Sequence, residues 1–130
     1  MTLLELNQHY ELVEKLTKAR EMLQSLRDAA CPGAAVLTGM PHAHGVKDKV
    51  GDLAAEIVDM DARVGWLEAE VKASEESIMP FICGIDDDQT RLIFRLRFLR
   101  GLAWKEVAAV IGGRNSEDSV KMVCYRYLSS

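Results

Sequence analysis

The chain is poor in aromatic residues, cysteine and proline, and it contains no long apolar run. Aromatic residues make up 6% of the 130 residues, so a core must be built mainly from aliphatic side chains and methionine. No apolar stretch approaches the roughly 18–20 residues that a membrane-spanning helix requires, and the N-terminus shows no secretory signal. With 48% apolar and 28% charged residues, we expect a folded, soluble, cytoplasmic protein with no membrane partner.

The sequence also lacks the residue patterns of common enzyme and metal sites. Cys31, Cys83 and Cys124 are odd in number and widely spaced, which indicates free thiols in a reducing compartment. His42 and His44 form a poor ligand pattern in a loop rich in Pro and Gly, and we interpret them as solvated. The glycine-rich stretches match neither the phosphate-binding loop nor the dinucleotide fingerprint. We therefore expect no enzyme, no cofactor and no metal site.

The charge is divided unevenly along the chain. Residues 89–130 hold eight Lys and Arg against three acidic residues, a net charge of +5. Residues 1–88 carry −9, so the overall charge of −4 hides a basic end on an acidic body. This division is typical of a protein that meets a polyanion with one end only.

Apolar residues recur at heptad spacing in two segments, with alternating steps of three and four residues. The first seam stops at a Cys-Pro-Gly sequence at residues 31–33. Leu6 and Tyr10 belong to a second apolar row on the same helix, so the first turns of this helix are expected to pack against a different part of the protein. The second seam begins near residue 47 and ends at Pro80, which predicts a long coiled-coil helix. The first seam consists of Leu12, Leu16, Ala19, Leu23, Leu26 and Ala30, and the second of Val50, Leu53, Ile57, Met60, Val64, Leu67, Val71, Ser74 and Ile78.

The two seams predict an N-terminal domain over residues 1–80, a coiled-coil helical hairpin with a loop at residues 31–46. An antiparallel hairpin is the simplest geometry, and parallel self-association through the same seams is the competing one. We also expect a homo-oligomer, because a small DNA-binding unit with few phosphate contacts gains affinity from a second copy.

Residues 86–130 predict a second domain of three short helices. Three aspartates at 86–88 suit the N-terminal cap of a helix that continues to about Arg100 and ends at Gly101. A helix over residues 104–111 precedes a turn at 112–114, and Asn115 or Ser116 caps the last helix. The expected inward residues are Leu92, Leu96, Leu99, Trp104, Val107, Ala108, Ile111, Val120, Val123 or Cys124, and Tyr127. The fold class is therefore expected to be all-α, a long antiparallel hairpin followed by a helix-turn-helix unit.

Several short motifs lie in the C-terminal half and in the preceding loop. They are Leu96-Arg97-Phe98, Gly101-Leu102, Trp104-x-Glu106-Val107-Ala108, Gly112-Gly113-x-Asn115-Ser116, Ser119-Val120-Lys121, and a Leu-Thr-Gly-Met-Pro stretch at 37–41. On these residues the helix-turn-helix segment resembles region 4 of sigma-70-type factors. The whole chain resembles small sigma-region-4-like proteins of phages and mobile elements in Gram-positive bacteria, which are related to the RinA and ArpU late-transcription activators. The chain departs from the family pattern in three ways: Ala103 stands where a capping Ser is common, the turn is about two residues longer, and a region-2-like segment is lacking.

The resemblance implies a DNA-binding transcription regulator in a bacterial cytoplasm, which binds double-stranded promoter or operator DNA and has RNA polymerase as a further possible partner. The final helix would read the major groove, while basic residues on the preceding helix and in the turn would contact phosphates. The candidate DNA-binding residues are Arg97, Arg100, Lys105, Arg114, Ser119, Lys121, Met122, Tyr125 and Arg126.

Two other functions fit the same pattern. A coiled-coil adaptor could use its basic end to bind an acidic partner such as RNA polymerase without touching DNA. A small-terminase-like packaging protein would also combine a helix-turn-helix with a coiled coil, and it would form a ring-sized oligomer. Glu117 and Asp118 at the start of the final helix repel phosphate, although they also stabilise the helix N-terminus.

Overall fold

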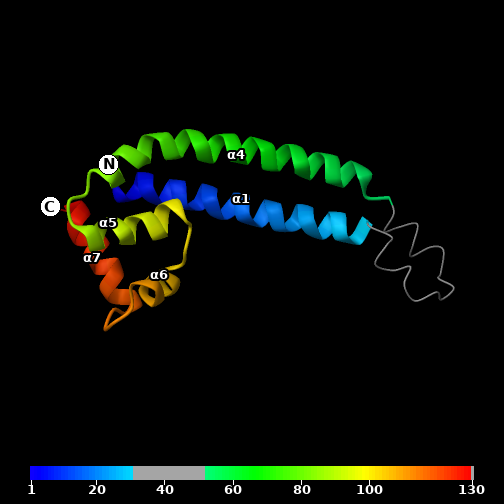
Figure 1. Ribbon diagram of the computed structural model, residues 1–130. Coiled ribbons are helices and arrows are strands. Elements are labelled where there is room, and N and C mark those ends of the chain that lie inside the picture. The colour runs from blue at the N-terminus through cyan, green and yellow to red at the C-terminus, as the bar shows by residue number, and fades with distance from the viewer. Residues whose placement is uncertain (31–51, 130) are drawn as a thin grey trace. The chain divides into compact units, whose positions relative to one another are not determined.

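The computed structural model describes residues 1–30 and 52–129, and these residues form an all-α structure without strands (Figure 1). The chain divides into two compact units. Unit 1 comprises residues 1–15 and 69–130, and unit 2 comprises residues 16–68. The helices are α1 (Leu3–Ala30), α4 (Ala54–Cys83), α5 (Asp88–Phe94), the π-helical turn η1 (Arg95–Leu99), α6 (Trp104–Ile111) and α7 (Glu117–Ser129).

Unit 2 pairs the second half of α1 with the first half of α4. Its buried residues lie on the two predicted heptad seams. Arg20 pairs with Glu68 at 3.5 Å, and Arg27, one heptad further along α1, pairs with Asp61, one heptad earlier on α4, at 3.2 Å. The two helices therefore run in opposite directions within this unit. The seam residues buried in unit 2 are Leu16, Ala19, Leu23, Val64 and Leu67.

Some of the N-terminal predictions fall on residues that the structure does not describe. The Cys-Pro-Gly stop, the loop at 31–46 with His42 and His44, Val50, and the predicted helix start near residue 47 all lie outside the described residues. Asp52 and Leu53, which are described, are not helical, and α4 begins at Ala54. The predicted helix through residues 52 and 53 is therefore wrong.

Pro80 does not end the second helix. The helix α4 continues through Pro80 to Cys83, and Pro80 itself is exposed. A proline inside a helix removes one backbone hydrogen bond, which costs about 3 kcal/mol. The turn after Pro80 carries Phe81 and the fully buried Ile82 into the core of unit 1, and this burial offsets the cost.

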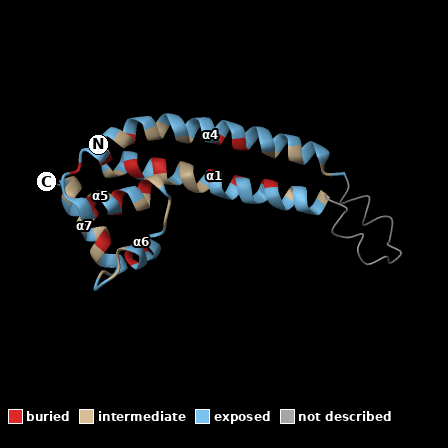
Figure 2. Ribbon diagram, in the orientation of Figure 1, coloured by how far each residue is buried: buried red, intermediate tan, exposed pale blue. Residues whose placement is uncertain are grey.

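The core of unit 1 joins the first turns of α1 and the last turns of α4 to the C-terminal helices (Figure 2). Leu6 is fully buried there, so the second apolar row of the first helix has a different partner, as the sequence predicts. The unit boundaries consequently differ from the predicted division near residues 80–86, because both ends of the predicted hairpin belong to this core. The buried cluster consists of Leu6, Ile78, Ile82, Ile85, Ile93, Phe94, Phe98, Trp104, Val107, Ala108, Val120 and Cys124.

The predicted inward row of the 86–100 helix is wrong in one position. Leu92 is 43% exposed, whereas Ile93, Phe94 and Phe98 are fully buried. Leu92 belongs to the regular helix α5, in which Thr90, Ile93 and Phe94 face the core, and helical spacing therefore turns Leu92 outward. The chain continues in η1, a π-helical turn in which the Arg100 N–H donates to the Arg95 carbonyl at 3.0 Å, and Phe98 of this turn is also buried.

His9 is a buried polar residue that the apolar pattern did not reveal. It is 1% exposed, and its Nδ1 lies 2.8 Å from the Ser74 hydroxyl of α4. Burial lowers the pKa of His9, while Glu75 and a hydrogen bond to the Phe98 backbone act in the opposite direction. The neutral imidazole is therefore the form that packs in this core.

We expect unit 1 to lose stability when the pH falls below about 6.5, the ordinary pKa of histidine. Because the pKa of His9 is lowered in the folded state, the unfolded chain takes up the proton at a higher pH than the folded chain does. The contribution of His9 to the free energy of unfolding is therefore present above about pH 6.5 and is lost as the pH falls below it. Urea denaturation at about pH 7.5 and about pH 5.5 measures the effect. The variant His9→Gln, which cannot titrate, should lose less stability over the same interval; an equal loss in both proteins would contradict the prediction.

Candidate nucleic-acid interface

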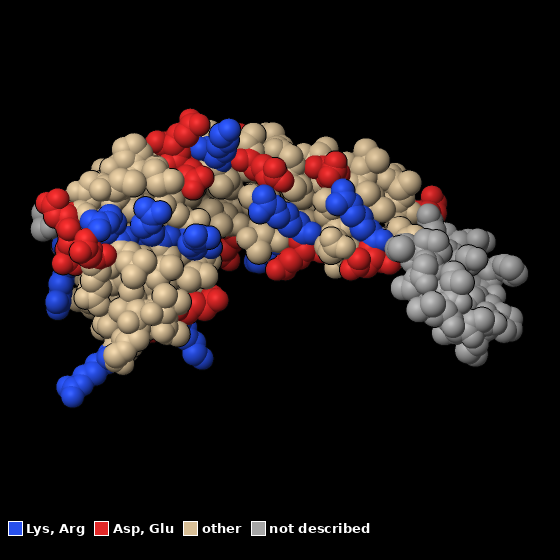
Figure 3. Space-filling model, viewed as in Figure 1, with Lys and Arg blue, Asp and Glu red and all other residues tan. Residues whose placement is uncertain are grey.

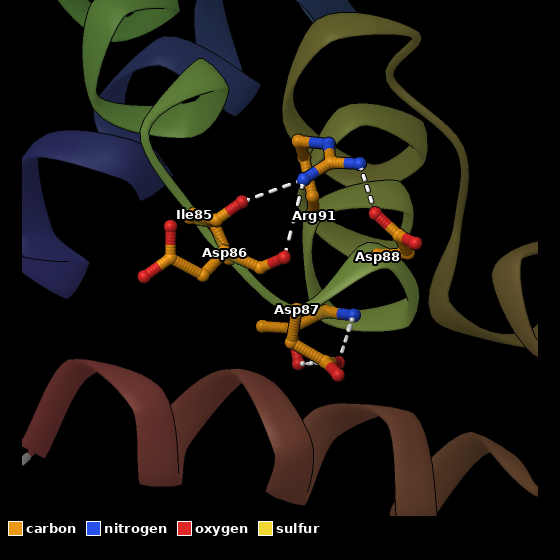
Figure 4. A network of polar contacts seen from close by, with 6 residues as sticks. Ile85, Asp86, Asp87, Asp88 and Arg91 are labelled. Carbon is orange, nitrogen blue, oxygen red and sulfur yellow. Dashed lines mark hydrogen bonds and ion pairs between the residues drawn. The ribbon is translucent and has the colours of Figure 1, made fainter.

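Two of the three aspartates that the sequence predicts to cap α5, Asp87 and Asp88, fix its start with their side chains (Figure 4). Asp87 is the N-cap, and its carboxylate accepts hydrogen bonds from the Thr90 backbone N–H at 2.9 Å and the Thr90 hydroxyl at 2.8 Å. These bonds lower the pKa of Asp87. Arg91 donates to the Ile85 carbonyl at 2.7 Å and pairs with Asp88. Arg91 therefore anchors the connection between α4 and α5.

The helix α6 has the predicted bounds, and its first turn is partly capped. Glu106 accepts a hydrogen bond from the Ala103 backbone N–H at 3.0 Å, which compensates in part for the missing capping Ser. Trp104, Val107 and Ala108 are buried, and Lys105 is exposed.

The turn between α6 and α7 is built on glycine. Gly112 and Gly113 have φ of 74° and 65°, a backbone region that other residues rarely adopt. Asn115 closes the turn, since its side-chain amide donates to the Gly112 carbonyl at 3.0 Å. Arg114 is exposed at the tip of this turn.

The N-terminus of α7 is capped by a pair of serines. The Ser119 N–H donates to the Ser116 hydroxyl at 3.2 Å, and the Ser116 N–H donates to the Ser119 hydroxyl at 2.9 Å. The sequence predicts Asn115 or Ser116 as the cap of this helix, and the structure shows that it is Ser116. Ser119, which was predicted to contact DNA, is committed to this cap and is only partly exposed.

One face of α7 is buried and the opposite face is open. Val120 and Cys124 are fully buried, and burial raises the pKa of the Cys124 thiol to about 12, so this cysteine is not reactive. Met122 is 45% exposed and Tyr125 is 40% exposed. At 100° per residue, these two side chains lie on the side of the helix away from the core.

Two basic residues flank this open face of α7. Helical spacing places Lys121 on one side of Met122 and Tyr125, and Arg126 on the other. Arg126 is exposed. Lys121 is partly exposed, and its ammonium lies 3.3 Å from the Glu117 carboxylate one turn earlier.

Arg97 is the predicted DNA-binding residue that the structure places elsewhere. Its guanidinium carbon lies 3.6 Å from the centroid of the Tyr10 ring and 4.5 Å from that of Trp104. Its Nη1 donates to the Leu102 carbonyl at 3.1 Å. Arg97 therefore stacks inside unit 1 between α1 and α6. No local sequence pattern indicates this contact, because Tyr10 is distant along the chain.

The remaining predicted cations are exposed. Figure 3 shows Lys and Arg side chains along the part of unit 1 that holds α5 and η1, and others that project from the α6–α7 part. Arg100, Lys105 and Arg114 are among the exposed residues. Arg95 is also exposed on η1 and adds a cation that the sequence prediction did not include.

Comparison of the chain with family models, curated proteins and solved structures gives no match. In the described part of the chain, no helix is long and apolar enough to cross a membrane. No group of three His, Cys, Asp or Glu side chains within residues 1–30 and 52–129 is placed to hold a metal ion. The candidate site is therefore the open face of α7, formed by Met122 and Tyr125, together with the basic residues beside it.

Proposed function

We propose that the protein is a phage or mobile-element transcription regulator that binds promoter or operator DNA with α7, in the manner of sigma region 4. The observation that supports this proposal most strongly is the open face of α7, where Met122 and Tyr125 lie between Lys121 and Arg126. This helix follows α6 through the turn at residues 112–116, which contains two glycines, and a helix, a turn and a second helix is the order found in helix-turn-helix proteins.

The proposed mechanism divides the exposed residues by role. Lys121 and Arg126, on opposite sides of α7, would contact the two phosphate walls of the major groove or guanine edges. Met122 and Tyr125 would meet apolar base edges such as the thymine methyl group. Phosphate contacts that fix the orientation of the helix would come from Arg100, Lys105 and Arg114.

The acidic residues at the start of α7 favour one alternative, a coiled-coil adaptor that binds a protein partner such as RNA polymerase. Glu117 and Asp118 are exposed at the end of the helix that would enter the groove, and Glu117 partly neutralises Lys121. An adaptor would retain its partner when DNA binding is absent. A ring-sized oligomer in light scattering would instead favour the packaging protein.

Replacing Lys121 and Arg126 together with Ala should nearly abolish DNA binding at moderate salt. Each lost phosphate contact removes about 0.9 from the slope of log affinity against log salt, so the slope should fall by about 2. Gel-shift titrations at several salt concentrations, with DNA selected from a random pool by the wild-type protein, measure both effects.

The matched control replaces two exposed lysines outside the site, Lys15 and Lys72, with Ala. It removes the same charge, so it should preserve most of the affinity. Equal losses in both double variants would show that binding depends on net charge alone, and no binding by the wild type at low salt would refute the proposal.

A further inference from the structure

Unit 2 contains an open groove between α1 and α4. The groove has a volume of about 710 Å³. Met22, Leu26 and Met60 supply apolar side chains to its wall. Glu21, Glu56 and Asp59 line it as well and make it acidic, with Lys18 as its one basic lining residue. A groove of this kind suits an apolar side chain that has a positively charged residue next to it.

The same face of α4 carries such a side chain. Trp66 is 52% exposed, although a large aromatic residue on a paired helix is normally covered. The Arg63 guanidinium carbon lies 4.6 Å from the centroid of the Trp66 ring. Trp66 follows Asp59 by seven residues and Arg63 follows Glu56 by seven, so all four lie along one face of the helix.

We infer that this face is self-complementary and that the occupant of the groove is Trp66 of a second copy of the chain. A two-fold axis perpendicular to α4, located between the groove and Trp66, would place each Trp66 in the groove of the other copy. Each Arg63 would then lie beside the acidic groove residues Glu56 and Asp59 of the other copy. A two-fold interface requires a projecting group and its receptor on the same patch, and this face provides both.

The heptad seams are not available for this contact, because Leu23, Val64 and Leu67 are already buried within unit 2. A second copy must therefore bind outside the seam, and within the described residues of unit 2 the Trp66 face combines exposed apolar surface with opposite charges. The inference does not depend on DNA binding by α7, since every residue that carries it belongs to unit 2.

Sedimentation equilibrium without DNA, over about two orders of magnitude of protein concentration, tests the inference. The wild type should form a dimer, and Trp66→Ala should raise the dimer dissociation constant by roughly tenfold or more, the effect expected for a central aromatic residue in an interface. Leu4→Ala is the control, because Leu4 is a 68% exposed apolar residue of unit 1, outside the proposed interface, and its truncation should leave the dissociation constant unchanged.

A charge exchange tests the arrangement. Arg63→Glu should weaken the dimer, and adding Asp59→Arg to the same chain should restore it, because the two positions face each other across the proposed interface. Helix content by circular dichroism verifies that each variant is folded. A single-chain mass at every concentration would overturn the inference, as would a ring-sized oligomer, or a dimer unaffected by both Trp66→Ala and Arg63→Glu. Loss of DNA binding in a protein that still forms this dimer would overturn only the proposed function.

Discussion

Phe98→Ala is expected to lower the free energy of unfolding by about 3–5 kcal/mol, the usual cost of removing a fully buried phenylalanine ring. Phe98 is 0% exposed, and its ring centroid lies 5.7 Å from that of Phe94 and 6.3 Å from that of Trp104. Phe94 in turn meets Phe81 and Tyr127 edge-on. The substitution therefore removes the link between η1, α6 and the aromatic cluster that joins α4 to α7.

The matched control for this prediction is Leu92→Ala. The sequence placed Leu92 in the core, but the side chain is 43% exposed, so its truncation should cost less than about 1 kcal/mol. Urea denaturation followed by circular dichroism measures both variants. Equal destabilisation would contradict the prediction, because it would mean that Leu92 is as buried as Phe98.

Gly101→Ala should destabilise the protein by about 2–4 kcal/mol, for two reasons that add. Gly101 has φ of 71°, a conformation that costs other residues about 1–2 kcal/mol. A Cβ at this position would also lie 2.7 Å from the Val13 Cγ1 atom of α1, where there is no room for it. The close approach of α1 to the end of η1 thus requires a residue without a side chain.

Two further variants separate the two causes. Gly113→Ala should lower the free energy of unfolding only through the φ of 65°, because nothing lies within 4 Å of the added Cβ. Its destabilisation should therefore be smaller than that of Gly101→Ala. Adding Val13→Ala to Gly101→Ala removes the overlapping Cγ1, so the double variant should lose less stability than the two single variants predict together. Strict additivity in thermal or urea unfolding would show that α1 does not contact Gly101 in solution.

Much of the local structure followed from short stretches of sequence. The bounds of α6, the aspartate cap of α5 and the stop at Gly101 all depend on interactions within a few residues, which a sequence pattern can report. The seam residues Leu16, Leu23 and Val64 are buried as predicted because the heptad period is set by helix geometry.

The candidate site was predictable only in part. Met122, Tyr125 and Arg126 have the exposure expected from helical spacing around Val120. Arg97 does not have the exposure that the sequence predicts, because its position depends on Tyr10 and Trp104. No local pattern distinguishes a stacked arginine from a solvated one.

By itself, the sequence determined that the chain forms helices, where α6 begins and ends, where α5 and α7 begin, and which face of α7 is apolar. These properties depend on neighbours within one or two turns. Tertiary structure alone decided that His9 and Leu6 join the C-terminal core, that α4 continues through Pro80, and that Phe98 replaces Leu92 inside. Each of these outcomes is a competition for buried space among side chains far apart in the chain, and the winner depends on shapes that exist only after the helices have packed.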